Sequence, residues 1–131
     1  ELFVQIYQQS PNDEIVVHLL GVIALSQRRF ETAVEYFTKA LTILPTYREA
    51  HNNLAAAYAE LGRYQDALAH LQRAAQLNPN DPLAHTNLGI ILSKLGRIDE
   101  ARIELRRAQA LAPNDPAVRA QIEGLEGISR R

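Results

Sequence analysis

Residues 51–79 read HNNLAAAYAELGRYQDALAHLQRAAQLNP, and this stretch predicts two short helices separated by a tight turn. Apolar residues recur at steps of three and four on either side of the turn, which is the spacing of one face of an α-helix. Gly62 stands between the two series, and glycine readily takes the left-handed backbone conformation that ends a helix. Pro79 follows the second series and cannot continue a helix. We therefore expect a helical hairpin here.

The same pattern recurs along the chain at a fixed period, which equals the interval from Pro45 to Pro79. Prolines, leucines, alanines and small residues all keep this spacing: Pro11, Pro45, Pro79 and Pro113; Leu20, Leu54 and Leu88; Ala33, Ala67 and Ala101; Ala40, Ala74 and Ala108; and Gly21, Ala55 and Gly89. The small residues predict a close crossing of the two helices in each pair. A fixed period of this length indicates a repeat protein, in which neighbouring pairs stack to bury their apolar faces.

The turns and helix starts follow the same period with one departure. Gly62 and Gly96 are expected to end the first helix of their pairs in the left-handed conformation, whereas Arg28 occupies the corresponding place in the first pair. A left-handed arginine would store roughly 1 kcal/mol of strain. Asp81 is expected to cap the next helix, with Pro82 at its first position.

These residues resemble the tetratricopeptide repeat family over nearly the whole chain. The resemblance implies an all-α fold, a right-handed superhelical solenoid of helix–turn–helix units. The family's run of leucine, small residue and aromatic residue, its two alanines and its closing proline are matched by Leu54, Ala55, Tyr58, Ala67, Ala74 and Pro79.

The resemblance also implies the division of the chain. Residues 1–13 would be the tail of a partial repeat, and residues 116–131 a capping helix and tail with Val118, Ile122 and Leu125 on one face. The three full repeats would be residues 14–47, 48–81 and 82–115. Because the chain begins with glutamate and contains no methionine, we expect it to be a segment of a longer protein.

No pattern in the sequence favours catalysis. The chain has no cysteine, no glycine-rich phosphate loop and no serine in a strained elbow. His51 and His85 are equivalent in adjacent repeats, so their expected separation of about 8–10 Å is too large for one metal ion. His18 and His70 have no partner at the spacing of metal ligands. We expect the histidines to have a packing role. We expect no metal site and no cofactor, and we do not expect the chain to be an enzyme.

The charge and hydropathy of the chain limit the classes of partner that we expect it to bind. A net charge of −1 gives no reason to expect nucleic acid. The longest apolar stretch, residues 15–25, is too short to span a bilayer. We therefore expect a protein or peptide partner, no nucleic acid and no membrane insertion, with the cytoplasm as the default location.

The resemblance implies where such a partner would bind. In this family the first helix of each pair lines a concave groove that holds ligand peptides. Carried over by alignment, the peptide-binding groove would be lined by Ile15, His18, Val22, Leu25, Asn52, Asn53, Ala56, Glu60, Leu83, Thr86, Asn87, Ile90 and Lys94.

Asn53 and Asn87 occupy matching places in adjacent repeats. A side-chain amide both donates and accepts, so it can pair with a peptide backbone. This pair resembles the asparagine ladder of the protein O-GlcNAc transferases; the equally weighted alternative is that each amide bonds within its own chain or to water. A basic clamp for acidic chaperone tails is not favoured. Of the clamp residues that the resemblance implies, only Asn53 is present, and the places of the others, which are mostly basic, are taken by His18, Val22, Leu83 and Asn87.

The first helix of the first full repeat is apolar on nearly all sides, which indicates that something covers it. The leading interpretation is a scaffold whose groove holds an extended or helical partner peptide with apolar side chains. The alternatives are self-association, as a dimer or a stacked array, through this helix, and an accessory domain of a larger enzyme.

Overall fold

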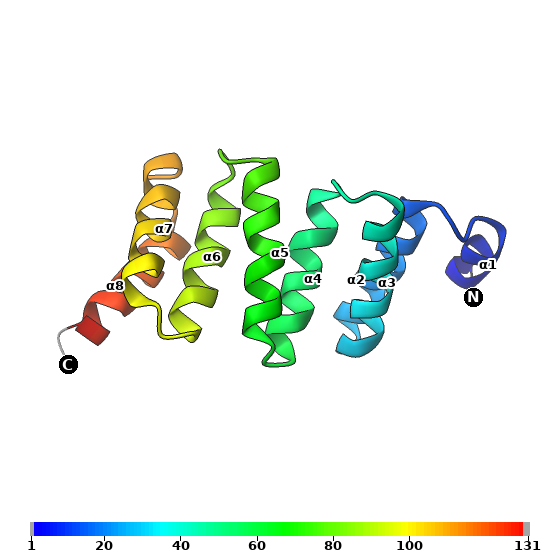
Figure 1. Ribbon diagram of the computed structural model, residues 1–131, viewed down its shortest axis with the longest axis horizontal. Coiled ribbons are helices and arrows are strands. Elements are labelled where there is room, and N and C mark those ends of the chain that lie inside the picture. Colours follow the sequence, from blue (N-terminus) through cyan, green and yellow to red (C-terminus); the bar gives the residue numbers. More distant parts are fainter. Residues whose placement is uncertain (1, 130–131) are drawn as a thin grey trace. The chain divides into compact units, whose positions relative to one another are not determined.

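The computed structural model describes residues 2–129, and over that range the chain consists of α-helices joined by short turns (Figure 1). The helices are α1 (Leu2–Gln9), α2 (Glu14–Ser26), α3 (Phe30–Ile43), α4 (Arg48–Glu60), α5 (Tyr64–Leu77), α6 (Pro82–Lys94), α7 (Ile98–Leu111) and α8 (Pro116–Ser129). The predicted all-α architecture of helix–turn–helix pairs is confirmed. Residues 1, 130 and 131, which belong to the expected terminal segments, lie outside the described residues.

The chain divides into two compact units, Glu1–His70 and Leu71–Arg131, and the division falls inside α5. Each unit has its own buried core. Val17, Phe37 and Leu54 are the largest fully buried side chains of the N-terminal unit, and Leu105 and Val118 are those of the C-terminal unit.

Aspartates cap three of the helices. The side chain of Asp13 accepts hydrogen bonds from the backbone N–H groups of Ile15 and Val16 at the start of α2. The predicted cap at Asp81 is confirmed, because Oδ1 accepts from the N–H of Leu83 at 3.0 Å. Asp115 does the same for α8, accepting from Ala117 N at 2.9 Å. These bonds satisfy donors that have no partner within the helix and so fix where each helix begins.

The turns within the helix pairs have the left-handed backbone expected of them. Gly62 has φ 75° and Gly96 has φ 77°, and Arg28 follows them with φ 61°. The predicted left-handed conformation of Arg28 is therefore confirmed. Its guanidinium lies 5.4 Å from the centre of the Phe30 ring, a cation–π contact that offsets part of the backbone strain.

The close helix crossings depend on glycine. A Cβ placed on Gly21 of α2 would stand 2.5 Å from Cε1 of the buried Phe37 in α3. A Cβ placed on Gly89 of α6 would stand 2.5 Å from Cγ of the buried Leu105 in α7. Both distances are far shorter than a van der Waals contact, so a side chain at either position would force the two helices apart.

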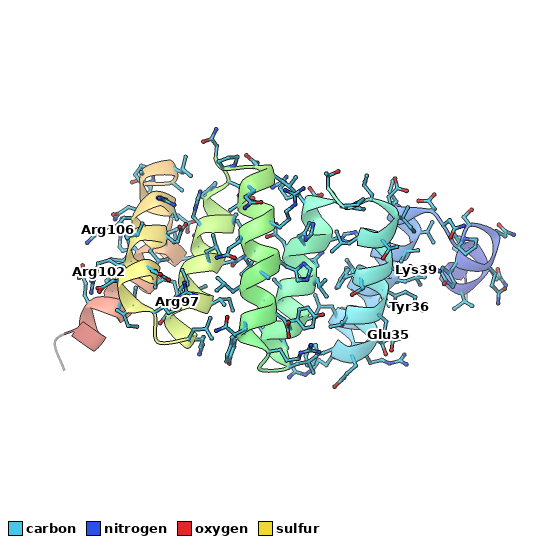
Figure 2. The ribbon with its side chains drawn as sticks, viewed as in Figure 1. Glu35, Tyr36, Lys39, Arg97, Arg102 and Arg106 are labelled. Carbon is cyan, nitrogen blue, oxygen red and sulfur yellow. The ribbon has the colours of Figure 1, made fainter. Side chains whose placement is uncertain are left out.

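Both terminal helices pack against a neighbouring pair. The ring of Tyr7 in α1 lies edge-on to Tyr36 of α3, with centroids 6.1 Å apart, and its hydroxyl accepts a hydrogen bond from Lys39. Figure 2 shows Tyr36 and Lys39 on α3. At the other end α8 lies against α6 and α7 and buries Val118, Ile122 and Leu125, the face predicted from the sequence. Between residues 2 and 129 there is no helix with the length and apolar character needed to cross a membrane.

Candidate functional site

The first helix of the α2–α3 pair carries an exposed apolar stripe. Ile15, Leu19 and Val22 are 56%, 42% and 37% exposed, and Ser26 continues the same line. They are spaced at steps of four, three and four, which places them on one face of α2. Of the other predicted groove residues of this helix, Leu25 is half-buried and His18 is buried.

The corresponding face of α4 is polar at its two ends and small in the middle. Glu49, Ala56 and Glu60 are exposed, while the predicted Asn52 and Asn53 are half-buried. Oδ1 of Asn52 is buried and has no hydrogen-bond partner among the described residues. In the N-terminal unit the predicted surface therefore changes from apolar on α2 to polar on α4.

The α6 face in the C-terminal unit is mixed. Leu83 is 57% exposed and Lys94 is exposed, and Asn87 and Ile90 are half-buried. Thr86, which the sequence placed in the groove, is instead buried, and its hydroxyl donates to the carbonyl of Pro82 at 2.8 Å. Its hydroxyl is thus used inside its own helix.

Three polar side chains of the N-terminal unit form a small network. Nδ2 of Asn53 lies 3.0 Å from Nε2 of His18, and the hydroxyl of Tyr47 lies 3.2 Å from Nδ1 of the same ring. Because the amide nitrogen can only donate, Nε2 accepts, and the neutral ring donates from Nδ1 to Tyr47. One N–H of Asn53 is therefore used within the chain, as the alternative interpretation of this residue expected.

Burial holds this network in its neutral forms. Desolvation lowers the pKa of His18 below its usual 6.5, and the nearby carboxylate of Glu49 opposes that shift. Desolvation also raises the pKa of Tyr47, with the carboxylates of Glu49, Glu14 and Asp13 acting in the same direction. Sequence reasoning missed Tyr47 because it stands at the position where the other repeats carry the capping aspartates Asp81 and Asp115.

The two equivalent histidines are buried and contact equivalent backbone carbonyls. Nε2 of His51 lies 2.8 Å from the carbonyl oxygen of Pro45, and Nε2 of His85 lies 2.7 Å from that of Pro79. Since a carbonyl only accepts, both Nε2 atoms donate. Each histidine thus fastens the start of its own helix pair to the proline turn before it.

The Nδ1 atoms of these histidines have different partners. Nδ1 of His51 lies 3.1 Å from Nδ1 of His70, and desolvation, followed by the charge of His51, lowers the pKa of His70. Nδ1 of His85 lies 2.7 Å from Oε2 of Glu104. From the sequence, His70 had no partner at the spacing of metal ligands, and its contact with His51, made across two antiparallel helices, was not foreseen. Among the described residues no group of three or more His, Cys, Asp or Glu side chains could hold a metal ion.

Models of one known protein family match most of the chain. Two family models, both described as tetratricopeptide repeat, match residues 18–82 and 60–122. A comparison with curated protein sequences found no match.

Several solved structures have the same fold. The crystal structure of MamA is similar over 97% of this chain and 75% of its own length, with a TM-score of 0.90 and 23% identity. The first TPR of Spaghetti (RPAP3), bound to the HSP90 peptide SRMEEVD, is similar over 90% of this chain and 94% of its own, with a TM-score of 0.86 and 21% identity. The Arabidopsis OM64 TPR domain is similar over 87% and 94%, with a TM-score of 0.83 and 24% identity.

Proposed function

Because the chain belongs to the tetratricopeptide repeat family, we propose that it is a protein–protein interaction module that binds a partner polypeptide through the exposed faces of the first helices of its pairs, α2 and α4 in one unit and α6 in the other. The observation that supports this best is the stripe of Ile15, Leu19 and Val22, three large apolar side chains in a row on α2. Exposed apolar surface of this kind marks binding sites, since burying it on a partner releases its water. We also take the pairs α2–α3, α4–α5 and α6–α7 as the repeat units 14–47, 48–81 and 82–115.

The chemistry of this surface favours an apolar partner segment. The peptide held by the first TPR of Spaghetti, SRMEEVD, carries two glutamates and an aspartate. In this chain the predicted groove residues Val22 and Leu83 are exposed apolar side chains, and His18 is buried in its neutral form. Such a surface provides little positive charge for an acidic peptide, whereas Ile15, Leu19 and Val22 would bury apolar side chains.

Asn53 and Asn87 would position the backbone of the bound segment. The contact with His18 uses one N–H of Asn53, and an asparagine amide has a second N–H and a carbonyl oxygen for further bonds. A grip of this kind on the peptide backbone would act with little regard to side-chain sequence.

The proposal can be tested without a known partner. Peptides that bind the chain would be selected from a random display library, and their affinities would be measured by calorimetry for the parent and for Val22→Glu. We expect selected peptides to be rich in apolar residues and to bind Val22→Glu at least tenfold more weakly, because a charge would have to be buried. Leu111→Glu is the control, since Leu111 is 41% exposed but lies on α7. Equal affinity for the parent and Val22→Glu would contradict the assignment of this face.

Self-association through α2 is the second candidate, and the same stripe favours it. A second copy of the chain could cover Ile15, Leu19 and Val22 as well as a partner could. Sedimentation equilibrium over a concentration series separates the two. A dimer that Val22→Glu converts to a monomer would support self-association, and a monomer at all concentrations would exclude it.

A further inference from the structure

A hollow of about 240 Å³ in the C-terminal unit is lined by residues of α6 and α7 and by Gln72 of α5. Its floor is formed by Leu88 and Leu92 of α6, which are almost completely buried, and one wall is Ile103 of α7. The rim carries Arg97, Glu100 and Glu104. A single buried water needs only about 10–15 Å³, so this space is large enough for a side chain.

The N-terminal unit shows what fills the same place there. Tyr58 stands one repeat period before Leu92, and its ring stacks on His70 with centroids 5.8 Å apart and planes at 23°. The guanidinium of Arg63 lies 4.6 Å from the centre of the Tyr58 ring. His70 and Arg63 likewise stand one period before Glu104 and Arg97. The tyrosine ring thus contacts both residues whose equivalents border the hollow.

Leu92 has no aromatic ring that could contact Arg97 and Glu104. The surrounding chemistry nevertheless suits one: the floor and wall are apolar, as the ring of a tyrosine requires. Arg97 takes the place of Arg63, so its guanidinium can face a ring whose π-surface is electron-rich. It is held at the rim by an ion pair between Nε and Oε2 of Glu100 at 2.5 Å.

The carboxylates of the rim provide an acceptor for a phenol. Oε2 of Glu104 lies 2.7 Å from Nδ1 of His85, and Oε1 accepts from Arg107 at 2.9 Å, which together fix the carboxylate in place. A carboxylate has about four lone-pair positions, so Glu104 has capacity for a further donor such as a hydroxyl. The charges of the site therefore complement both parts of a tyrosine side chain, the face of the ring and the hydroxyl hydrogen.

A second hollow suggests that the ring belongs to a polypeptide. It lies beside the first along α7, and Arg102, Ile103, Arg106 and Ala110 are among its lining residues. Figure 2 shows Arg97 near the start of α7 and Arg102 and Arg106 farther along the same helix. Ile103 is 54% exposed and borders both hollows, so a segment that places one side chain in each would bury it. A free phenol could fill only one of them.

We propose that the hollow over Leu88 and Leu92 binds a tyrosine side chain of a partner polypeptide, with the face of the ring toward Arg97 and the hydroxyl directed to Glu104. The hydroxyl donates to a carboxylate of the rim, and the neighbouring residues of the partner cover Ile103. This surface is formed by α7 over α6 and does not include the stripe on α2, so it is independent of the function proposed above.

The first test uses p-cresol, the side-chain analogue of tyrosine, titrated into the isotope-labelled chain and followed by the amide signals of α6 and α7. We expect saturable shifts around Leu88, Leu92 and Ile103, and binding of toluene about tenfold weaker because it lacks the hydroxyl. Leu92→Tyr fills the hollow from within and should abolish the shifts. Val22→Glu is the control and should leave them unchanged.

Two further variants keep the result decisive. If Leu92→Tyr does not fold, as judged by circular dichroism, Leu92→Phe places a ring without a hydroxyl in the same space. Tyr58→Leu should create a second p-cresol site in the N-terminal unit. Absence of saturable shifts, or p-cresol binding unaffected by a folded ring substitution at position 92, would overturn the proposal.

The second test distinguishes a polypeptide from a small phenol. The peptide acetyl-Ala-Ala-Tyr-Ala-Leu-Ala-amide should bind more tightly than p-cresol and should shift the Ile103 signal, and Ile103→Ala should weaken the peptide but not p-cresol. Binding of p-cresol with no gain for the peptide would overturn the assignment to a partner polypeptide. If the chain forms dimers at high concentration and p-cresol dissociates them, the occupant of the hollow is a second copy of the chain. That result would also overturn the assignment to a partner polypeptide.

Discussion

The α4–α5 and α6–α7 pairs each hold a buried histidine against the carbonyl of the preceding proline, but the other neighbours of the two histidines differ. Nδ1 of His51 contacts Nδ1 of His70, whose ring stacks on that of Tyr58. His85 meets the carboxylate of Glu104, beside an open hollow. The helices and turns are the same in both pairs, so the backbone does not dictate the polar chemistry between the helices. In one pair the ring of Tyr58 packs against His70 and Arg63, and in the other there is a charged acceptor and space for a further side chain.

Tyr58→Leu breaks this contrast with the largest expected effect. The variant removes a ring that stacks on His70 and lies under Arg63, and leaves a hollow like that in the C-terminal unit. We expect the free energy of unfolding to fall by about 2–3 kcal/mol from lost burial and aromatic contact. Urea unfolding would measure it. Leu92→Tyr is the reciprocal change, and a similar loss there would show that the two places are not equivalent.

Glu104→Ala tests the charged acceptor of the second pair. Without the carboxylate, Nδ1 of the buried His85 loses its partner, and we expect a loss of about 1–2 kcal/mol. Glu100→Ala is the matched control, because its ion pair with Arg97 is solvent-exposed and should contribute about 0–1 kcal/mol. Equal losses in the two variants, measured by chemical unfolding, would contradict the importance of the buried contact.

The pH dependence of stability tests the neutral histidine pair of α4–α5. The pKa of His70 is lowered in the folded chain, mainly by desolvation and then by His51, so the unfolded chain binds protons more readily. The stabilising contribution is therefore complete above the unfolded value of about 6.5 and is lost as the pH falls below it. We expect the free energy of unfolding to decrease between pH 7.5 and 5.5.

His70→Gln should reduce that decrease, since the titrating ring is gone. His18, whose pKa is also lowered, contributes in the same direction and should keep part of the dependence in the variant. An identical pH profile in parent and variant would show that His70 does not titrate differently in the folded and unfolded chains.

Arg28→Gly has the smallest expected effect. It gives the first turn the residue that Gly62 and Gly96 provide in the others and removes the strain of a left-handed arginine. The cation–π contact with Phe30 is lost at the same time, so we expect a gain of only about 0.5–1 kcal/mol, seen as a higher melting temperature. An unchanged or lower melting temperature would show that the strain is not significant.

Sequence periodicity was sufficient for the fold because the features that define it are local. The regularly spaced prolines, the glycines of the turns and the cap at Asp81 each act within a few residues of their position. Even the left-handed backbone of Arg28 followed from its equivalence to Gly62.

The polar contacts could not be predicted in the same way. His51 with His70, and His85 with Glu104, meet across antiparallel helices whose relative rotation the pattern does not specify. His51 and His70 are separated by the same number of residues as His85 and Glu104. That equality could have predicted one contact only after the other was known. The replacement of Tyr58 by Leu92 was visible in the sequence, whereas the space that it leaves depends on the packing of α6 and α7.

The most direct test of the proposed function is to map the contact surface of a selected peptide by cross-saturation NMR. We expect saturation to transfer from the bound peptide to the side chains of Ile15, Leu19 and Val22 on α2. Transfer confined to α3 and α7, with none to the α2 stripe, would contradict the proposed function.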